Sequence, residues 1–267
     1  MRTDFDHLFE AAAAFVGVPT LADDEAGKAF VNLVKSLFPF DYCVIFAYRG
    51  TERPIDLFST FDAGQYEIFV RMYQDGPYLL DPFFSAASLP RPGVWRMRAL
   101  APDRFFASEY YRSYYVKTGL SEEVGFFVPA GEGVTVVLSL MRGEQLGVFR
   151  DAEYGLMRKA EPFVAAMVGH VWGRLGARFD RAVTGRRQGA SGDGASARAR
   201  ISERLTARET SIIELVLQGH SSESVGLRLG VATGTVKVHR RNIYRKLGIS
   251  SQAQLMSLYL GRLKVPD

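Results

Sequence analysis

The chain has 267 residues, of which 47% are hydrophobic and 23% charged, so we expect an ordinary globular protein with room for two domains. No run of about 18 apolar residues is present, and acidic residues precede the short apolar run near the N-terminus, which argues against a membrane-spanning helix and a secretory signal. The single cysteine, Cys43, excludes an internal disulfide framework and predicts a cytoplasmic protein.

The formal net charge of +4 is the sum of an acidic N-terminal part and a basic C-terminal part. Residues 1–175 contain 17 Lys and Arg against 22 Asp and Glu, whereas residues 198–267 contain 12 against 5. A small basic part behind an acidic part is typical of a protein whose C-terminal end contacts a polyanion. Charge alone leaves a solvated basic face as the alternative.

The first 180 residues mix helical and strand periodicities. Helices are predicted at 4–17, 23–38, 63–74, 103–117 and 151–179, the last of them kinked or divided at Pro162. Strands are predicted at 41–50 and 54–60, followed by a hairpin at 122–143 that turns at residues 131–133. Helices on an antiparallel sheet predict an α+β sensor domain at residues 1–180, an α/β/α sandwich of the PAS or GAF kind.

Residues 181–200 are rich in Gly, Ser, Ala and Arg, have little to bury, and predict a flexible linker. Residues 201–267 then predict an all-α domain of four short helices. Thr206 and Glu209 have the spacing of a capping box and open the first helix. The other three are expected at about 222–229, 233–247 and 252–262, which is the pattern of a helix-turn-helix domain.

The third of these helices is basic, and its side chains are sorted by face. Val236, Ile243 and Leu247 form one narrow apolar stripe at helical spacing. Lys237, Val238, Arg241 and Arg245 fall together on another face. A helix that buries one face and presents cations on another fits the major groove of B-DNA, whereas a merely solvated basic helix is the alternative.

The candidate DNA-binding residues divide by expected role. Lys or Arg pairs with guanine O6 and N7, and an apolar side chain contacts the thymine methyl group. The residues expected to contact bases are Lys237, Val238 and Arg241. The residues placed for DNA contact on or beside that face, mainly for phosphates, are Thr235, Arg240, Tyr244, Arg245 and Lys246.

Residues 205–260 resemble the LuxR/NarL-type DNA-binding domain along its whole length. The matching motifs are Leu-Thr-x-Arg-Glu at 205–209, Gly219, Thr-Val-Lys-x-His at 235–239 and Asn-Ile-x-x-Lys-Leu-Gly at 242–248. The resemblance implies that the basic helix reads bases and that the last helix dimerises. Ala232 stands where a capping Ser is common, and Gly226 stands where Ala is usual. Region 4 of a sigma factor is the nearest alternative for this domain.

Aromatic side chains concentrate between Phe58 and Phe127, where 17 of the chain's 33 Phe, Trp and Tyr lie. Seven of these are Tyr, and each buried phenol needs a hydrogen-bond partner, so the pattern favours a small-molecule pocket over a plain core. The candidate ligand-binding residues are Tyr73, Tyr78, Asp81, Trp95, Tyr110 and Tyr114. Packing in the core or at a dimer interface is the alternative for each of them.

Residues 73–95 resemble, distantly, the acyl-homoserine-lactone domain of quorum-sensing LuxR proteins. The resemblance implies that Asp81, followed by Pro82, and Trp95 bind the signal's amide and lactone carbonyl. The family's upstream Trp and Tyr fall on Ile68 and Met72. Residues 76–115 look more similar to a set of LuxR-type regulators whose ligands are not named, so the effector stays open.

The sequence therefore predicts a cytoplasmic, homodimeric transcription regulator that binds double-stranded DNA and a small-molecule effector, with RNA polymerase as a further candidate partner. No enzyme activity, cofactor or metal is predicted, because no catalytic arrangement or phosphate-binding loop is found and the four histidines, His7, His170, His220 and His239, are scattered. The alternative function is a ligand-independent regulator whose first domain dimerises or binds a protein partner.

Overall fold

The computed structural model describes residues 5–16, 23–89, 91–116, 119–186 and 193–261. The chain divides into two compact units, each assembled from three stretches. Unit 1 consists of 1–71, 85–100 and 119–183, and unit 2 of 72–84, 101–118 and 184–267. These units do not coincide with the domain boundaries predicted at 180 and 200, because two segments of the predicted sensor domain pack with the C-terminal helices.

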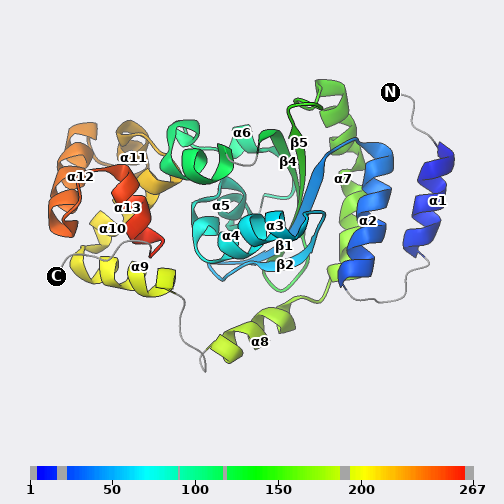
Figure 1. Ribbon diagram of the computed structural model, residues 1–267, viewed down its shortest axis with the longest axis horizontal. Coiled ribbons are helices and arrows are strands. Elements are labelled where there is room, and N and C mark those ends of the chain that lie inside the picture. The colour runs from blue at the N-terminus through cyan, green and yellow to red at the C-terminus, as the bar shows by residue number, and fades with distance from the viewer. Residues whose placement is uncertain (1–4, 17–22, 90, 117–118, 187–192, 262–267) are drawn as a thin grey trace. The chain divides into compact units, whose positions relative to one another are not determined.

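Unit 1 is built on a five-stranded antiparallel sheet (Figure 1). Its strand order is β2 (Ile55–Ser59), β1 (Tyr42–Arg49), β5 (Val134–Gly143), β4 (Leu120–Pro129) and β3 (Gly93–Arg96). The α+β fold class, both N-terminal strands and the hairpin are confirmed. Strand β3 was not predicted, because four residues are too few to show a two-residue period.

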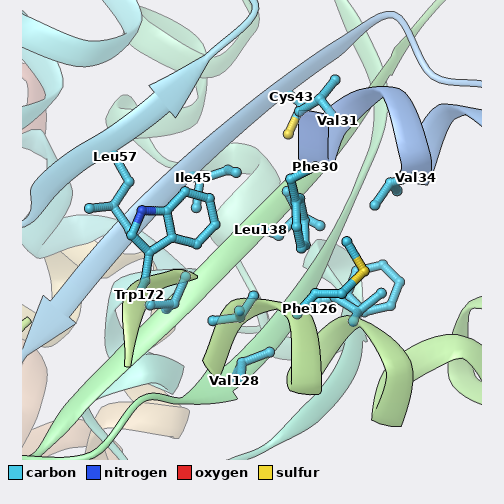
Figure 2. Close-up of a cluster of buried hydrophobic side chains, with 14 of the residues drawn as sticks. Phe30, Val31, Val34, Cys43, Ile45, Leu57, Phe126, Val128, Leu138 and Trp172 are labelled. Carbon is cyan, nitrogen blue, oxygen red and sulfur yellow. The ribbon is translucent and has the colours of Figure 1, made fainter. Parts of the chain in front are cut away.

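Three helices belong to one side of this sheet: α1 (Phe5–Val16), α2 (Asp23–Leu37) and α7 (Asp151–Trp172). Helices α2 and α7 lie along the sheet face, and α1 packs on α2 (Figure 1). Phe30 of α2 and Trp172 of α7 meet in an edge contact with ring centroids 5.7 Å apart, over Ile45 and Leu138 (Figure 2). Cys43 is buried in the same core, and burial raises the pKa of its thiol, which fits a packing role.

Helix α7 continues through Pro162, so of the two predicted outcomes, a kink or a division at Pro162, the division is wrong. The helix ends at Gly173 instead, and α8 (Gly176–Arg186) follows. A Cβ atom on Gly173 would lie 2.5 Å from the carbonyl oxygen of Gly169. The backbone is therefore too close at this point for any residue with a side chain.

One buried ion pair joins the sheet to the start of α7, and a second joins two neighbouring strands of the sheet. Arg142 of β5 donates to both carboxylate oxygens of Glu153, at 3.0 and 3.2 Å. Arg96 of β3 donates to Glu122 of β4 at 2.8 Å. All four side chains are at most 8% exposed, so these charges are compensated by one another rather than by water.

Short helical segments connect the strands. The run predicted at 63–74 is confirmed as α3 (Ala63–Tyr66), the π-helix η1 (Glu67–Arg71) and α4 (Met72–Gln74). Then come the 3-10 helix η2 (Pro77–Leu80), α5 (Pro82–Ser88) and α6 (Met97–Leu100). The α-helix predicted at 103–117 is not formed: the segment holds the 3-10 helix η3 (Phe105–Ala107) and the π-helix η4 (Tyr111–Tyr115).

Unit 2 contains the five C-terminal helices. They are α9 (Asp193–Arg204), α10 (Ala207–Gln218), α11 (Ser222–Leu229), α12 (Thr233–Leu247) and α13 (Gln252–Tyr259). The last four confirm the predicted helix-turn-helix arrangement. The linker prediction at 181–200 differs from the structure, in which α8 extends to Arg186 and α9 begins at Asp193. Ala197 and Ile201, one helical turn apart, are buried, and this narrow apolar stripe was masked by the polar composition around it.

Candidate DNA-binding helix and sensor-side clusters

The apolar stripe of helix α12 packs against the neighbouring helices of unit 2. Val236, Ile243 and Leu247 are each 0% exposed, and α12 packs against α10 and α11. Burying three branched side chains fixes the rotation of the helix about its axis. The opposite face is therefore presented outward by packing, independently of any charge.

The outward face carries the residues predicted to contact bases. Lys237, Val238 and Arg241 are exposed, Val238 to 46%. Within the described part of the chain, neither Lys237 nor Arg241 forms an ion pair. Two cations and an accessible apolar side chain on one helix face match the donor and methyl pattern of the major groove.

The predicted phosphate-contacting residues are placed less uniformly. Thr235 and Arg245 are exposed, and Arg245 donates to Asn242 at 3.3 Å. Arg240 is half-buried and donates to the hydroxyl of Ser222 on α11 at 3.3 Å. The Tyr244 hydroxyl is buried and has no hydrogen-bond partner among the described residues.

Lys246 is bound within the protein. Its Nζ donates to both carboxylate oxygens of Glu209, at 2.7 and 2.8 Å. Glu209 is only 5% exposed and completes the capping box with Thr206 at the start of α10. The Lys246 hydrogen bond is the main reason why the pKa of Glu209 is lowered. The structure thus gives Lys246 a role in joining α12 to α10, which the sequence analysis missed.

The turn between α11 and α12 explains one departure noted in the sequence. A Cβ atom on Gly226 would lie 2.6 Å from the carbonyl oxygen of Val231, whose N–H donates to the Gly226 carbonyl at 3.0 Å. Glycine at 226 therefore permits the close turn. Ala232 is the N-cap of α12 and, as expected, makes no side-chain cap hydrogen bond.

The turn between α10 and α11 is bonded to residues 101–108, which also belong to unit 2. The Arg104 N–H donates to the Gly219 carbonyl at 2.9 Å, and the Ser221 N–H donates to Asp103 Oδ1 at 3.0 Å. Gly219 has a φ of 100°, and a Cβ atom there would lie 2.7 Å from the Cα of Phe105. Glycine is thus required at 219 both by backbone conformation and by close approach.

Three of the six candidate ligand-binding residues form one buried cluster. The Tyr73 hydroxyl donates to Asp81 Oδ2 at 2.7 Å, and the Phe83 N–H donates to Asp81 Oδ1 at 2.8 Å. Tyr78 meets Tyr73 edge-on, with centroids 6.3 Å apart. Burial raises the pKa of Asp81 to about 6, although the hydrogen bonds from Tyr73 and Phe83 lower it. Both Asp81 oxygens are therefore bonded inside the protein.

The other three candidates are placed differently. Trp95 lies on β3 in unit 1, and its indole N–H donates to the Arg91 carbonyl at 3.1 Å. Tyr110 is buried beside Phe105, with ring centroids 5.9 Å apart. The side chain of Tyr114 lies outside the described residues, although its backbone belongs to η4.

A cavity of about 710 Å³ lies in unit 1, among residues that the sequence analysis did not select. Its walls come from the start of α2, from β2, and from α3 and η1. Carboxylates and aromatic rings line it together, including Asp56, Phe58 and Tyr66. No sequence signal marked this site, because it is formed only when an edge strand and two separate helical segments meet.

Two further features are absent from the described part of the chain. No group of three or more His, Cys, Asp or Glu is arranged to hold a metal ion. No described helix is both long enough and apolar enough to cross a membrane.

Residues 203–259 match the family model described as "Bacterial regulatory proteins, luxR family". Over 187 residues the chain is 33% identical to the protein named "Putative HTH-type transcriptional regulator in exeN 3'region" of Aeromonas salmonicida, covering 68% of this chain and 94% of that protein. The fold of this chain is similar to that in the crystal structure of the VqsR LBD domain from Pseudomonas aeruginosa. The TM-score is 0.50, and the identity is 21% over 61% of this chain and 92% of that one.

Proposed function

The chain belongs to the luxR family of bacterial transcription regulators, and we propose that it controls transcription by inserting α12 into the major groove of promoter DNA. The observation that supports this proposal is that the apolar and the basic side chains of α12 lie on different faces of the helix. Its apolar stripe is fully buried, whereas Lys237, Val238 and Arg241 are exposed on the other face. In this arrangement the two cations pair with guanine edges and Val238 contacts a thymine methyl group.

Phosphate contacts position the helix. Thr235, Arg240 and Arg245 lie beside the base-reading face, where hydroxyl and guanidinium groups bind phosphate oxygens without reading sequence. The Tyr244 hydroxyl lacks a partner among the described residues but is buried, so its contact with a phosphate requires the side chain to turn outward. Lys246 is omitted from this set because Glu209 already binds its ammonium group.

Selection of duplexes from a random pool tests the DNA-binding proposal. The full chain should enrich one short motif, and the same pool selected with a Lys237→Ala/Arg241→Ala double variant should enrich none. Recovery of an equally strong motif by both proteins would show that another surface reads the bases.

The protein acts as a homodimer in this proposal, because helix-turn-helix domains commonly bind two half-sites about one DNA turn apart. A motif made of two related halves and a dimeric mass in solution are the expected results. A single unrepeated motif bound by a monomer would contradict this part of the proposal. RNA polymerase is then a candidate partner at the promoter.

A small-molecule effector bound to the N-terminal α+β fold controls the regulator in this proposal. Likeness to the VqsR LBD domain supports the fold of such a domain, and the candidate polar group is the buried Tyr73–Asp81 pair, in the segment 72–84 that belongs to unit 2. A ligand changes regulation only if it binds one conformation better than another. Native mass spectrometry of protein from its own host should show an added mass; its absence would favour the ligand-independent alternative.

A further inference from the structure

The turn that opens α11 is bonded to a segment of the predicted sensor domain. Ser221 is the N-cap residue of α11, and its N–H donates to Asp103 Oδ1 at 3.0 Å, across 118 residues of chain. Beside this bond, the Arg104 N–H donates to the Gly219 carbonyl at 2.9 Å. Residues 101–108 therefore contact the DNA-binding helices through both a side chain and the backbone, inside unit 2.

The carboxylate of Asp103 completes the cap of α11. At the start of α10 the capping box is local, because the Thr206 hydroxyl accepts the Glu209 N–H and Glu209 accepts the Thr206 N–H at 2.9 Å. In α11 the first half of this pattern is present, since the Ser221 hydroxyl accepts the Ser224 N–H at 3.0 Å. Ser224 has the position equivalent to that of Glu209, but its side chain is too short to reach back to the N-cap N–H. Asp103 supplies the carboxylate from a distant part of the sequence instead.

Residues 101–108 are themselves fixed by packing. Phe105 is 0% exposed, and its ring meets that of Tyr111 with centroids 5.6 Å apart. Because this packing already orders the segment, forming the cap costs little further conformational entropy. Partial burial raises the pKa of Asp103, but the hydrogen bonds from Ser221 outweigh this effect and lower the pKa overall. The group that caps α11 is therefore a charged carboxylate at neutral pH.

The capped end of α11 is connected to α12. The two helices pack against each other, and Arg240 of α12 donates to the hydroxyl of Ser222, the first residue of α11. Lys237 and Arg241 of α12 are exposed, so the contact with residues 101–108 leaves the base-reading side chains accessible. Order in the first turn of α11 therefore affects the position of α12 without covering the face that reads DNA.

We infer that Asp103 is a positioning residue for DNA recognition: by capping α11 it holds the first turn of that helix, and through it α12, in the orientation that base reading requires. This inference rests on DNA binding by α12, as proposed above. Without the cap, the first turn of α11 frays in the free protein, and the apparent affinity for a specific site falls in proportion to the fraction of molecules that are competent to bind it. Binding to random DNA depends on phosphate charge and does not require one orientation of α12.

Fluorescence anisotropy of the full chain with the selected motif and with a random duplex tests the inference. Asp103→Ala should lower the ratio of motif affinity to random-DNA affinity by about 3- to 10-fold, the size expected for one lost capping hydrogen bond. The ratio is the relevant measure, because removing a negative charge strengthens binding to both duplexes alike. A wild-type chain without any motif preference would refute DNA binding by α12 and this inference with it. A wild-type preference that Asp103→Ala keeps in full would refute the positioning role alone.

Two further variants separate capping from charge. Asp103→Asn removes the charge but keeps an oxygen that accepts the Ser221 N–H, so it should retain most of the wild-type ratio. Glu223→Gln removes an exposed carboxylate from the first turn of α11 itself and should leave the ratio within about twofold of wild type. If either variant lowered the ratio as much as Asp103→Ala does, charge rather than capping would explain the effect, and the inference would be overturned.

Hydrogen exchange of the wild-type chain provides a readout that needs no variant. The amides of Arg104 and Ser221 should be protected in the free protein and should keep this protection when the selected duplex is bound, because the cap belongs to the DNA-bound conformation. Loss of protection at Arg104 on DNA binding would mean that residues 101–108 leave α11 in the complex. That result would contradict the positioning role of Asp103.

Discussion

Arginine has different roles in α12 and in the sheet of unit 1. On α12, Arg241 is exposed and forms no ion pair within the described chain, so its charge is available to another molecule. In the sheet, Arg142 is 3% exposed and both oxygens of Glu153 bind it. Exposed cations can be removed at little cost to folding, whereas a buried cation leaves its partner uncompensated. The same substitution should therefore affect binding in one region and stability in the other.

Arg142→Ala should have the largest effect, because it leaves the Glu153 carboxylate buried without its main partner. We expect a loss of about 3–5 kcal/mol in the free energy of unfolding. Chemical denaturation followed by circular dichroism measures it. Arg241→Ala is the control and should unfold at the wild-type midpoint; equal destabilisation by both would remove the distinction between the two regions.

Acid should destabilise the sheet through the same ion pair. The hydrogen bond from Arg142 is the main reason why the pKa of Glu153 falls from 4.5 to about 2. A carboxyl with a lowered folded-state pKa stabilises the protein above its unfolded-state pKa and loses this contribution as pH falls through the folded-state pKa. About 3 kcal/mol should be lost between pH 5 and pH 2. Glu153→Gln, already destabilised at neutral pH, should show a flatter pH dependence of unfolding in this window.

Arg241→Ala should weaken binding to the selected motif by about 1–3 kcal/mol, while binding to random DNA changes little. The reason is that a base contact contributes to specific complexes only. Fluorescence anisotropy with both duplexes at one salt concentration measures the ratio. If specific and random DNA lose affinity equally, Arg241 contacts phosphates and the base-reading face is assigned incorrectly.

The smallest effects should separate two neighbouring cations of α12. Arg245→Ala should leave stability unchanged and lower the salt slope of DNA binding by about 1, as expected for one lost phosphate contact. Lys246→Ala should instead leave the salt slope unchanged and reduce stability by about 1 kcal/mol, because it removes the cation from the nearly buried Glu209. The opposite pattern would return Lys246 to the phosphate-contacting set.

The C-terminal helices were predictable because their signals are local. The Thr206–Glu209 capping box and the glycines at 219, 230 and 248 mark helix ends within a few residues, and the stripe of Val236, Ile243 and Leu247 repeats along one helix. The pairing of Lys246 with Glu209 spans 37 residues and has no such signal.

In the predicted sensor domain, residues 1–180, the sheet could be predicted from the sequence. The positions of the candidate binding residues could be predicted less well. Alternating strands revealed β1, β2 and the hairpin, whereas the helix predicted at 103–117 failed because its aromatic spacing reflects packing of Phe105 with neighbouring tyrosines. Tyr73 and Asp81, eight residues apart, were selected together and do meet. Asp56 was not selected, because an isolated acidic residue in a short edge strand differs from a solvated one only after α2 and α3 are in place.

The bonds between residues 101–108 and the turn at Gly219 bear on how regulators of this family are recombined in the laboratory. Chimeras that exchange everything after residue 184 would pair a foreign turn with the resident 101–108 segment. The foreign turn would then need glycine at the position of Gly219, since a Cβ atom there would lie 2.7 Å from the Phe105 Cα. Transplanting residues 101–108 together with the C-terminal helices keeps the matched surfaces in one piece.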